Sequence, residues 1–485
     1  MSVAIALFVK NEAHDIISWI SWHFALGVDK IYVYDDYSTD GTFEILKCAS
    51  LILNIEVFKT DLSQSFFFYR QRDSYFDAIK RSVGIFDWVA LLDGDEYIDI
   101  RNFHNINDYL GNFQSDHSAI ALNWCIYGSS SRIMKDNIPV YKSFNYHSDQ
   151  SLNDNSLVKS IVRPEKIVFN YENPHKFFIA DGVYVDGCGE NFDWKPGATK
   201  DILWEGARIN HYVCRSMEHF VSRIRRRIGV DLSNSTVYWD HFNRNDIYDP
   251  VNVSISAKAD EFDCLIKKII IKEFFNRVLN KYNIIYPNMG RDKSHVYLYK
   301  KCKVFNLKSY HKHLLSTNNI DGHVVQKGNE DFKIFVVFLD NYDCAYLYRY
   351  NNSLVSNIKY HIFKDNRKQY CYKFNVEKVD DEYLFFKSPE NGHYLTSLPE
   401  ISGFAVEASR EDKNDWEKFS LVETNMSINV FASKSEETFE TLISEIIESG
   451  GYLDENEFIL RFSCLPEEEK ERVLHFSGKS FAWLM

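Results

Sequence analysis

The sequence predicts an α/β fold with a mostly parallel sheet at the start of the chain. Over residues 1–110, short apolar runs of strand length alternate with segments whose apolar residues recur at helical spacing. Strands separated by helices of this length are usually parallel and joined by right-handed crossovers. Acidic clusters follow two of the runs directly. Because ligands bind beyond the carboxyl ends of strands in such sheets, these clusters are the first candidates for a functional site.

The expected elements follow one another in a regular order. Residues 3–9 form an uninterrupted apolar run, which predicts a first strand buried on both faces. Residues 15–25 predict a helix, because apolar side chains recur there every three or four positions. By the same criteria, strands are expected at 30–34, 55–58 and 88–92, and helices at 42–49 and 74–83.

The rest of the chain is less regular, and changes of pattern set its boundaries. Short β-like runs are expected at 119–124, 160–162, 182–185 and 207–212, followed by a helix with a basic face at 217–228. Further on, the pattern is helical and rich in lysine, then aromatic and β-branched, and finally helical and acidic. We therefore divide the chain into a first domain (1–255), a helical segment (256–318), a β-rich module (319–428) and a C-terminal helical segment (429–485).

The composition excludes some functions and favours one cellular location. The chain has 56 Lys and Arg against 69 Asp and Glu, so its net charge of −13 gives no basic field for nucleic acid. Its nine cysteines are scattered and never spaced C-x-x-C, which indicates reduced thiols and no zinc site. No apolar run is long enough to span a bilayer. We expect a soluble cytoplasmic protein, with association at the inner membrane surface left open.

The most informative motif is Asp93-Gly94-Asp95-Glu96, which ends the strand expected at 88–92. Three carboxylates at the end of a buried strand repel one another, and they are costly to desolvate without a partner. A hard divalent cation such as Mg²⁺ or Mn²⁺ is the usual partner, and such ions bind phosphate groups through one or two protein carboxylates. A charged strand-to-loop turn is the alternative explanation.

Three further clusters are candidates for a nucleotide or phosphate site. Asp35 and Asp36 follow the second strand, where a base or ribose could donate hydrogen bonds to them. Arg70 and Gln71 precede the third expected helix and could contact a nucleotide, although a solvated basic turn explains them equally well. The cluster Arg223–Arg227 could neutralise phosphate on a donor or a lipid-linked acceptor, or it could be a solvated helix face.

Taken together, the motifs resemble a GT-A-fold glycosyltransferase of the family 2-like group related to glycosyltransferase family 92. The resemblance covers about residues 1–250. It is carried by Lys10-Asn11-Glu12, Asp35-Asp36-x-Ser38-x-Asp40-Gly41-Thr42, Trp88–Glu96, Lys159–Pro164, His175, Tyr184–Gly187, and Ile209-Asn210-His211-Tyr212 with Arg215-Ser216. One departure precedes His175, where Asn173-Pro174 stands in place of a Gly-Val-like turn.

The resemblance implies a Rossmann-like GT-A domain and a nucleotide-sugar donor, preferably a UDP-sugar, bound with Mn²⁺ or Mg²⁺. The metal ligands that it implies are Asp93, Asp95 and His211, of which the aspartates are alternatively ribose ligands. The donor-binding residues that it implies are Asn11, Glu12, Asp36 and Asp93, and the position of Arg70 and Gln71 before the third expected helix adds these two as candidates. His211 could instead be a core histidine at a strand end.

Sugar transfer with inversion also needs a carboxylate that takes the proton from the attacking acceptor hydroxyl. This base should lie after the Asp-x-Asp motif, on an acceptor-side loop. Asp186 is the preferred candidate because its Val-Asp-Gly context is part of the resemblance, and Glu190 and Asp193 follow it. For each of them, an ordinary surface carboxylate is the alternative.

We therefore expect a metal-dependent, inverting glycosyltransferase of the hexosyltransferase type, acting on a glycan or glycolipid acceptor as in surface polysaccharide synthesis. A nucleotidyltransferase is one alternative, although it normally has a Gly-rich basic loop where this chain has Phe8–Glu12. A non-catalytic carbohydrate-binding or scaffold protein is another. Residues 391–395 and 415–419 resemble phrases of fascin-type β-trefoils, so the β-rich module is expected to be trefoil-like.

Overall fold

The computed structural model divides the chain into two compact units. Unit 1 comprises Met1–Ile270 with Lys479–Trp483 and Met485, and unit 2 comprises Ile271–Gly478 with Leu484. The structure describes residues 1–282, apart from 134, 136, 196 and 228–234, and residues 300–485, apart from 319–322, 328–333, 340–342, 352–353, 357–360, 363–372, 390 and 431–436.

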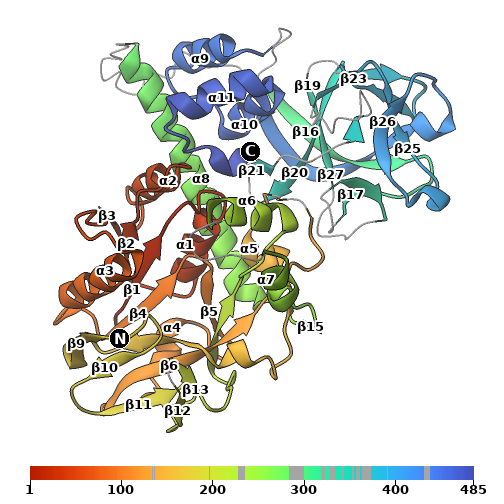
Figure 1. Ribbon diagram of the computed structural model, residues 1–485. Coiled ribbons are helices and arrows are strands. Elements are labelled where there is room, and N and C mark those ends of the chain that lie inside the picture. Colours follow the sequence, from red (N-terminus) through yellow and green to blue (C-terminus); the bar gives the residue numbers. More distant parts are fainter. Residues whose placement is uncertain are drawn as a thin grey trace. The chain divides into compact units, whose positions relative to one another are not determined.

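Unit 1 is built on a nine-stranded sheet (Figure 1). Its strands lie in the order β3-β2-β1-β4-β8-β6-β14-β5, and β11 also pairs with β6. Strands β3, β2, β1 and β4 are parallel, β6 is parallel to β14 and β11, and β8 and β5 run antiparallel to their neighbours. The bounds are β1 Val3–Val9, β2 Lys30–Asp35, β3 Ile55–Lys59, β4 Trp88–Asp93, β5 Glu96–Ile100, β6 His117–Ile126, β8 Val158–Val162, β11 Val183–Asp186 and β14 Ala207–His211. The predicted α/β fold with a mostly parallel sheet is confirmed.

Helices and short strand pairs make up the connections of unit 1. The helices are α1 Ile16–Ala25, α2 Thr42–Ala49, α3 Phe67–Ser82, α4 Ile106–Leu110, α5 Val140–Ser143, α6 Met217–Arg227, α7 Ser235–Phe242 and α8 Val253–Lys281, whose last part belongs to unit 2. The short pairs are β9 Ile167–Tyr171 with β10 Phe177–Ile179, β12 Trp194–Lys195 with β13 Ala198–Thr199, and β7 Tyr146–His147 with β15 Ile247–Tyr248.

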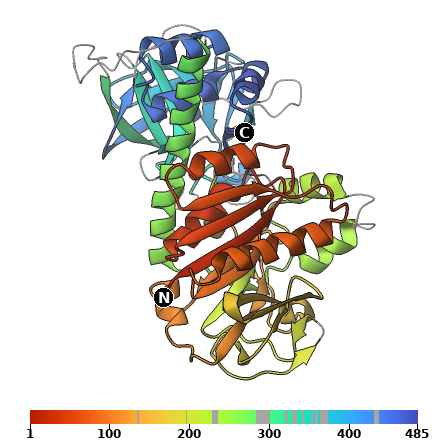
Figure 2. The same ribbon diagram turned by 90° about the vertical axis from the view of Figure 1, so that its left-hand side faces the viewer.

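The burial of β1 explains why the sheet forms at the apolar runs. Every residue of this strand is buried, as expected for a strand that is covered on both faces. Ala4 and Ala6 lie in one core cluster with Ile79 of α3, the orange helix beside the sheet in Figure 2. The indole N–H of Trp19 in α1 donates to the carbonyl of Glu96 at 2.8 Å, which ties this helix to β5.

The third helix begins earlier than the sequence pattern indicates. It was expected at 74–83, but α3 starts at Phe67, so Arg70 and Gln71 lie within the helix and not before it. The aromatic side chains of Phe66–Tyr69 are exposed and follow no apolar periodicity, which is why the pattern misses this part of the helix.

Unit 2 contains a ten-stranded, mainly antiparallel sheet in the order β21-β20-β19-β16-β27-β24-β25-β26-β22, with β23 paired to β20 and β24. Its strands, with the separate pair β17 and β18, are β16 Lys300–Ser309, β17 Leu315–Thr317, β18 Val324–Gln326, β19 Phe335–Leu339, β20 Cys344–Asn351, β21 Leu354–Ser356, β22 His361–Ile362, β23 Lys373–Lys378, β24 Leu384–Lys387, β25 Tyr394–Ser397, β26 Val406–Arg410 and β27 Phe419–Val430. Helices α9 Phe439–Glu448, α10 Glu455–Cys464 and α11 Glu467–Phe476 follow. The β-rich region and the C-terminal helices are confirmed, whereas the trefoil-like arrangement stays a prediction.

The segment expected to be helical at 256–318 differs from the structure toward its end. Helix α8 ends at Lys281, and strand β16 begins at Lys300. The lysines of β16 suggested a helix, but they alternate with buried Cys302 and Val304 at the two-residue period of a strand. Among the described residues, none of the helices is both long enough and apolar enough to cross a membrane.

Candidate active site

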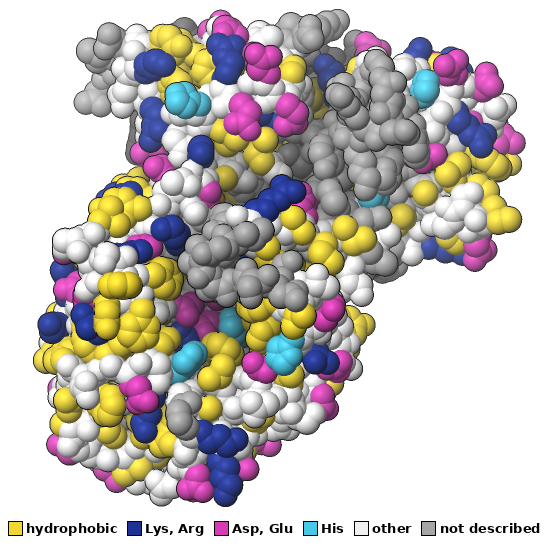
Figure 3. All heavy atoms as spheres, viewed as in Figure 1, with side chains coloured by type: hydrophobic (Ala, Val, Ile, Leu, Met, Phe, Trp, Pro, Cys, Tyr) yellow, Lys and Arg dark blue, Asp and Glu magenta, His cyan; other side chains and the backbone are white. Residues whose placement is uncertain are grey.

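The strand register brings the predicted site residues to one edge of the sheet. Val9, the last residue of β1, pairs with Asp35 at the end of β2, and Phe8 pairs with Asp93 at the end of β4. His211 is the last residue of β14, which runs parallel to β6. The carboxyl ends of parallel strands form the edge at which α/β proteins bind ligands. Acidic and histidine side chains lie side by side on the face of unit 1 shown in Figure 3.

Asp36 anchors two cationic side chains at this edge. Arg70 donates from Nε and Nη2 to its two carboxylate oxygens, at 2.6 and 2.9 Å. Lys10 Nζ donates to Oδ2 at 3.1 Å, and Thr60 Oγ1 donates to Oδ1 at 2.8 Å. Burial opposes the charge, but the hydrogen bonds from Arg70, Thr60 and Lys10 outweigh it and lower the pKa of Asp36 to about 2. The carboxylate is thus a fixed anion that orients Arg70 and Lys10.

Asn11 shapes the loop that follows β1. Its φ of 56° is left-handed, and its side-chain Oδ1 accepts a hydrogen bond from the backbone N–H of Thr39 at 2.8 Å. Its own backbone N–H donates to Ser38 Oγ at 2.8 Å. These bonds join the loops after β1 and β2, so Asn11 lies at the expected edge and holds two of its loops together.

Asp93 has partners on both carboxylate oxygens. Gln71 and Tyr75 of α3 donate to Oδ1 at 2.7 and 2.9 Å. Lys159 of β8 donates to Oδ2 at 2.6 Å. The structure therefore brings the predicted residues Gln71 and Asp93 together, but as partners of each other. With three donors already bound, Asp93 has less capacity left for a metal ion than a free carboxylate has.

Lys159 belongs to the site, although its sequence context predicted no chemical role for it. Only 1% of its side chain is exposed, and its Nζ lies 3.2 Å from Glu96 Oε2 as well as against Asp93. Burial raises the pKa of Glu96 to about 7, against the opposing charge of Lys159. A buried cation thus compensates part of the carboxylate cluster for which a divalent ion was expected. The only sequence signal was its place in the motif 159–164.

Asp95 and His211 are the pair best suited to hold a divalent cation. His211 Nε2 lies 3.6 Å from Asp95 Oδ1, while Arg223 of α6 donates to the other oxygen, Oδ2, at 3.0 Å. Despite burial, Arg223 and His211 keep the pKa of Asp95 well below its usual range. In the described part of the chain, His211 Nδ1 and Glu96 Oε1 are buried without a hydrogen-bond partner. Other buried side-chain atoms of the described residues also lack a partner, so the fit to a metal ion rests on the ligand types: carboxylate oxygens suit Mn²⁺ and Mg²⁺, and a neutral imidazole nitrogen is a common metal ligand.

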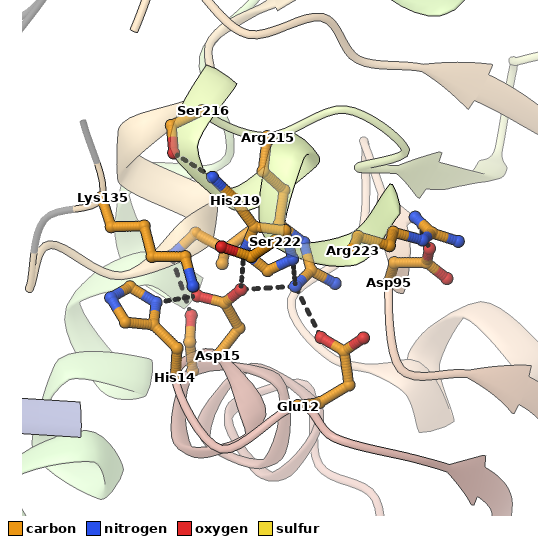
Figure 4. A network of polar contacts seen from close by, with 12 residues as sticks. Glu12, His14, Asp15, Asp95, Lys135, Arg215, Ser216, His219, Ser222 and Arg223 are labelled. Atoms are coloured by element: carbon orange, nitrogen blue, oxygen red, sulfur yellow. Dashed lines mark hydrogen bonds and ion pairs between the residues drawn. The ribbon is translucent and has the colours of Figure 1, made fainter. Parts of the chain in front are cut away.

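Glu12 lies in a neighbouring buried network (Figure 4). Arg215 donates to Glu12 Oε2 at 2.6 Å and also pairs with Asp15, and His219 Nδ1 lies 3.2 Å from Asp15 Oδ2. The two carboxylates and the histidine are close enough together to hold a metal ion, but the Arg215 guanidinium already supplies a cation among them. Glu12 borders the Asp-x-Asp turn, since a Cβ on Gly94 would lie 3.3 Å from Glu12 Cγ.

Asp186 and Glu190 are not brought to this edge. On β6, Asp186 pairs with Ala121 whereas His211 pairs with Ile126, five positions further along the strand. Five strand residues span about 17 Å. Asp186 Oδ1 also accepts two backbone N–H groups of its own turn, at 2.8 and 3.0 Å, and Glu190 is exposed. These turn hydrogen bonds account for an aspartate in the Val-Asp-Gly motif, and the catalytic role of Asp186 stays a prediction.

Glu96→Gln should change how stability depends on pH. The folded-state pKa of Glu96, about 7, lies above the ordinary value of 4.5, so the folded state binds the extra proton between these values. The stability contributed by this proton is fully present below about pH 4.5 and is lost as the pH rises through about 7. Glutamine does not ionise, so the free energy of urea unfolding of the wild type, relative to the variant, should fall from pH 4.5 to pH 8. The same pH dependence in both proteins would contradict this assignment.

The fold and the site together define an α/β protein whose strand ends present carboxylates, a histidine and several cationic side chains. Groups of these types can bind a phosphate-bearing ligand together with a divalent ion. Residues 1–180 match the family described as Glycosyltransferase family 92. This match confirms the resemblance seen in the sequence.

Individual relatives agree with this family match. A Glycosyltransferase family 92 protein of Ricinus communis is 24% identical over 233 residues, which cover 47% of this chain and 38% of that protein. Another, of Oryza sativa subsp. japonica, is 22% identical over 235 residues, covering 47% and 36%. The chain thus spans little more than a third of the length of these relatives. Among solved structures, S. aureus TarS residues 1–349 in complex with UDP is 17% identical to this chain, with a TM-score of 0.23. The matched region covers 34% of this chain and 47% of that one.

Proposed function

We propose that this chain is a glycosyltransferase that moves a sugar from a nucleotide-sugar donor, a UDP-sugar, to a hydroxyl group of a glycan or lipid-linked glycan. The observation that carries the proposal is the Asp95–His211 pair at the carboxyl edge of the sheet. The family match of residues 1–180 gives this edge its most direct interpretation.

The residues at this edge have separate roles in the proposal. Asp95 and His211 would hold Mn²⁺ or Mg²⁺, and a bound metal ion offsets the charge of the departing nucleoside diphosphate. Arg70 and Lys10, oriented by Asp36, supply positive charge on the donor side. Asn11, Glu12, Gln71 and Asp93 shape the loops and strand ends around the donor.

Two finer points are part of the same proposal. Inversion at the anomeric carbon requires the acceptor to approach from the side opposite the diphosphate, with a proton acceptor next to the attacking hydroxyl.

A cytoplasmic location, at the inner membrane surface where lipid-linked acceptors lie, is supported by the free state of the eight cysteines in the described residues.

A thermal-shift screen of UDP-sugars with and without Mn²⁺ tests this function. A ligand at a hundred times its dissociation constant stabilises the folded state by about 2.7 kcal/mol, which should raise the melting temperature by several degrees. We expect such a shift with a UDP-sugar and Mn²⁺ together, and a smaller one with either alone. No shift with any UDP-sugar would contradict the proposal. A shift with nucleoside triphosphates alone would favour a nucleotidyltransferase.

A further inference from the structure

His175 is held rigidly in the loop between β9 and β10. The side chain of Asn173 accepts hydrogen bonds from the backbone N–H groups of His175 and Lys176, at 2.9 and 3.1 Å. Ser160 Oγ donates to the His175 carbonyl at 2.8 Å. The turn that departs from the family pattern is therefore well defined, and it fixes the backbone of this histidine on both sides.

The hydrogen bond of the imidazole defines which nitrogen carries the proton. His175 Nδ1 lies 2.9 Å from the carbonyl oxygen of Val158. A carbonyl only accepts, so Nδ1 must be the donor and Nε2 must carry the lone pair of the neutral ring. Nε2 makes no hydrogen bond to any described residue, and the side chain is half-buried rather than enclosed.

The position of His175 relative to His211 places it on the acceptor side of the proposed site. The ring of Trp124, near the end of β6, has its centroid 4.2 Å from that of His211 and 5.3 Å from that of His175. In the strand order of the sheet, β2 lies on one side of β4, and β8, β6 and β14 lie on the other. Asp36, which follows β2, and its partner Arg70 of α3 belong to the first side. A donor whose nucleotide lies on the first side directs its sugar toward the second, where the acceptor has to approach.

We propose that His175 is the catalytic base of the transfer, a proposal that rests on the proposed function. The acceptor hydroxyl gives its proton to Nε2, and the electron pair of the O–H bond becomes available for the new bond from oxygen to the anomeric carbon. The bond between that carbon and the diphosphate oxygen breaks, and its electron pair leaves with the nucleoside diphosphate. The proton ends on Nε2, the sugar on the acceptor oxygen and the negative charge on the nucleoside diphosphate. The ring needs only a free lone pair on Nε2, and the hydrogen bond from Nδ1 to Val158 leaves that lone pair free.

The electrostatic environment agrees with this role. Burial, together with the nearby charge of Lys159, lowers the pKa of His175 to about 4. The imidazole is therefore neutral at pH 7, and its basicity is close to that of an ordinary glutamate carboxylate. Such a ring can take the proton in place of the carboxylate that was expected at Asp186. It lies beside Trp124, near the end of β6, whereas Asp186 pairs with Ala121 in the middle of that strand.

The test uses the full chain, Mn²⁺ and the UDP-sugar that gives the largest thermal shift, with octyl β-glucoside as acceptor probe and UDP release as the rate. His175→Gln should lower the rate roughly a hundredfold or more. The dissociation constants of UDP and Mn²⁺ and the melting temperature should stay close to those of the wild type. Imidazole in the buffer should restore part of the rate of His175→Ala.

The matched control is His147→Gln, because His147 also donates Nδ1 to a backbone carbonyl, that of Ser148, at 2.7 Å. This variant should keep the wild-type rate and gain nothing from imidazole.

A wild-type rate in His175→Gln overturns the proposal. A loss of rate that is accompanied by weaker Mn²⁺ binding or a lowered melting temperature overturns it as well. A hundredfold loss in Asp186→Asn with none in His175→Gln returns the base to Asp186. If the wild type binds the UDP-sugar but releases no UDP, or binds none, the proposed function itself fails.

Discussion

Asp95→Asn is expected to lower the rate of sugar transfer roughly a thousandfold. A rate loss of this size is typical when an enzyme loses a group that stabilises charge in the transition state. Asparagine keeps the size of the side chain but removes the charge that faces His211 at 3.6 Å and Arg223 at 3.0 Å. The affinity for Mn²⁺ should fall at least tenfold with it. UDP release gives the rate, and a Mn²⁺ titration followed by electron paramagnetic resonance gives the affinity.

Asp93→Asn is the matched comparison for this prediction, because it removes one charge from the same turn. The oxygens of Asp93 are engaged by Gln71, Tyr75 and Lys159, so this variant should lose much less Mn²⁺ affinity than Asp95→Asn. Equal losses of affinity would mean that both aspartates bind the ion directly, as the sequence motif implies, and would contradict the division of roles drawn from the geometry.

The core of unit 1 could be predicted because its strands are buried on both faces. The apolar run 3–9 coincides with β1, and the run 88–92 coincides with β4 except for Asp93. The same pattern places the acidic residues at strand ends, and parallel pairing then brings those ends to one edge. Periodicity, by contrast, carries no signal where a helix is not apolar on one side, as at the exposed start of α3.

The partners of the site residues could not be predicted, because they come from distant parts of the chain. Lys159 lies 66 positions after Asp93, and Arg215 lies 203 positions after Glu12. Local sequence shows that a carboxylate needs a cation, but it does not show whether the cation is a metal ion, a lysine or an arginine. The place of Asp186 depends in the same way on register, which puts it five positions along β6 from the level of His211.

Lys159→Met should be the most destabilising single substitution at the site, with a loss of about 3–5 kcal/mol in the free energy of unfolding at pH 8. Methionine fills similar space but leaves Asp93 and Glu96 without their buried cation, and the Glu96 side chain is fully buried. Urea unfolding of both proteins measures the difference. Lys159→Arg is the control, because it keeps the positive charge but changes the shape of the side chain. It should therefore lose less stability than Lys159→Met.

The pH dependence of this loss separates charge from packing. Without Lys159, the pKa of Glu96 should rise further, because the charge of the Lys159 ammonium group opposes the effect of burial more strongly than any other neighbour does. Below about pH 5, Glu96 is protonated and uncharged in both proteins. The loss of unfolding free energy in Lys159→Met should therefore be smaller there, because only the unpaired charge of Asp93 still contributes to it. Adding Glu96→Gln to Lys159→Met should likewise recover stability at pH 8. If the loss is the same at pH 5 and pH 8 and Glu96→Gln recovers none of it, Lys159 stabilises the site through packing, and the compensation of charge assigned to it is wrong.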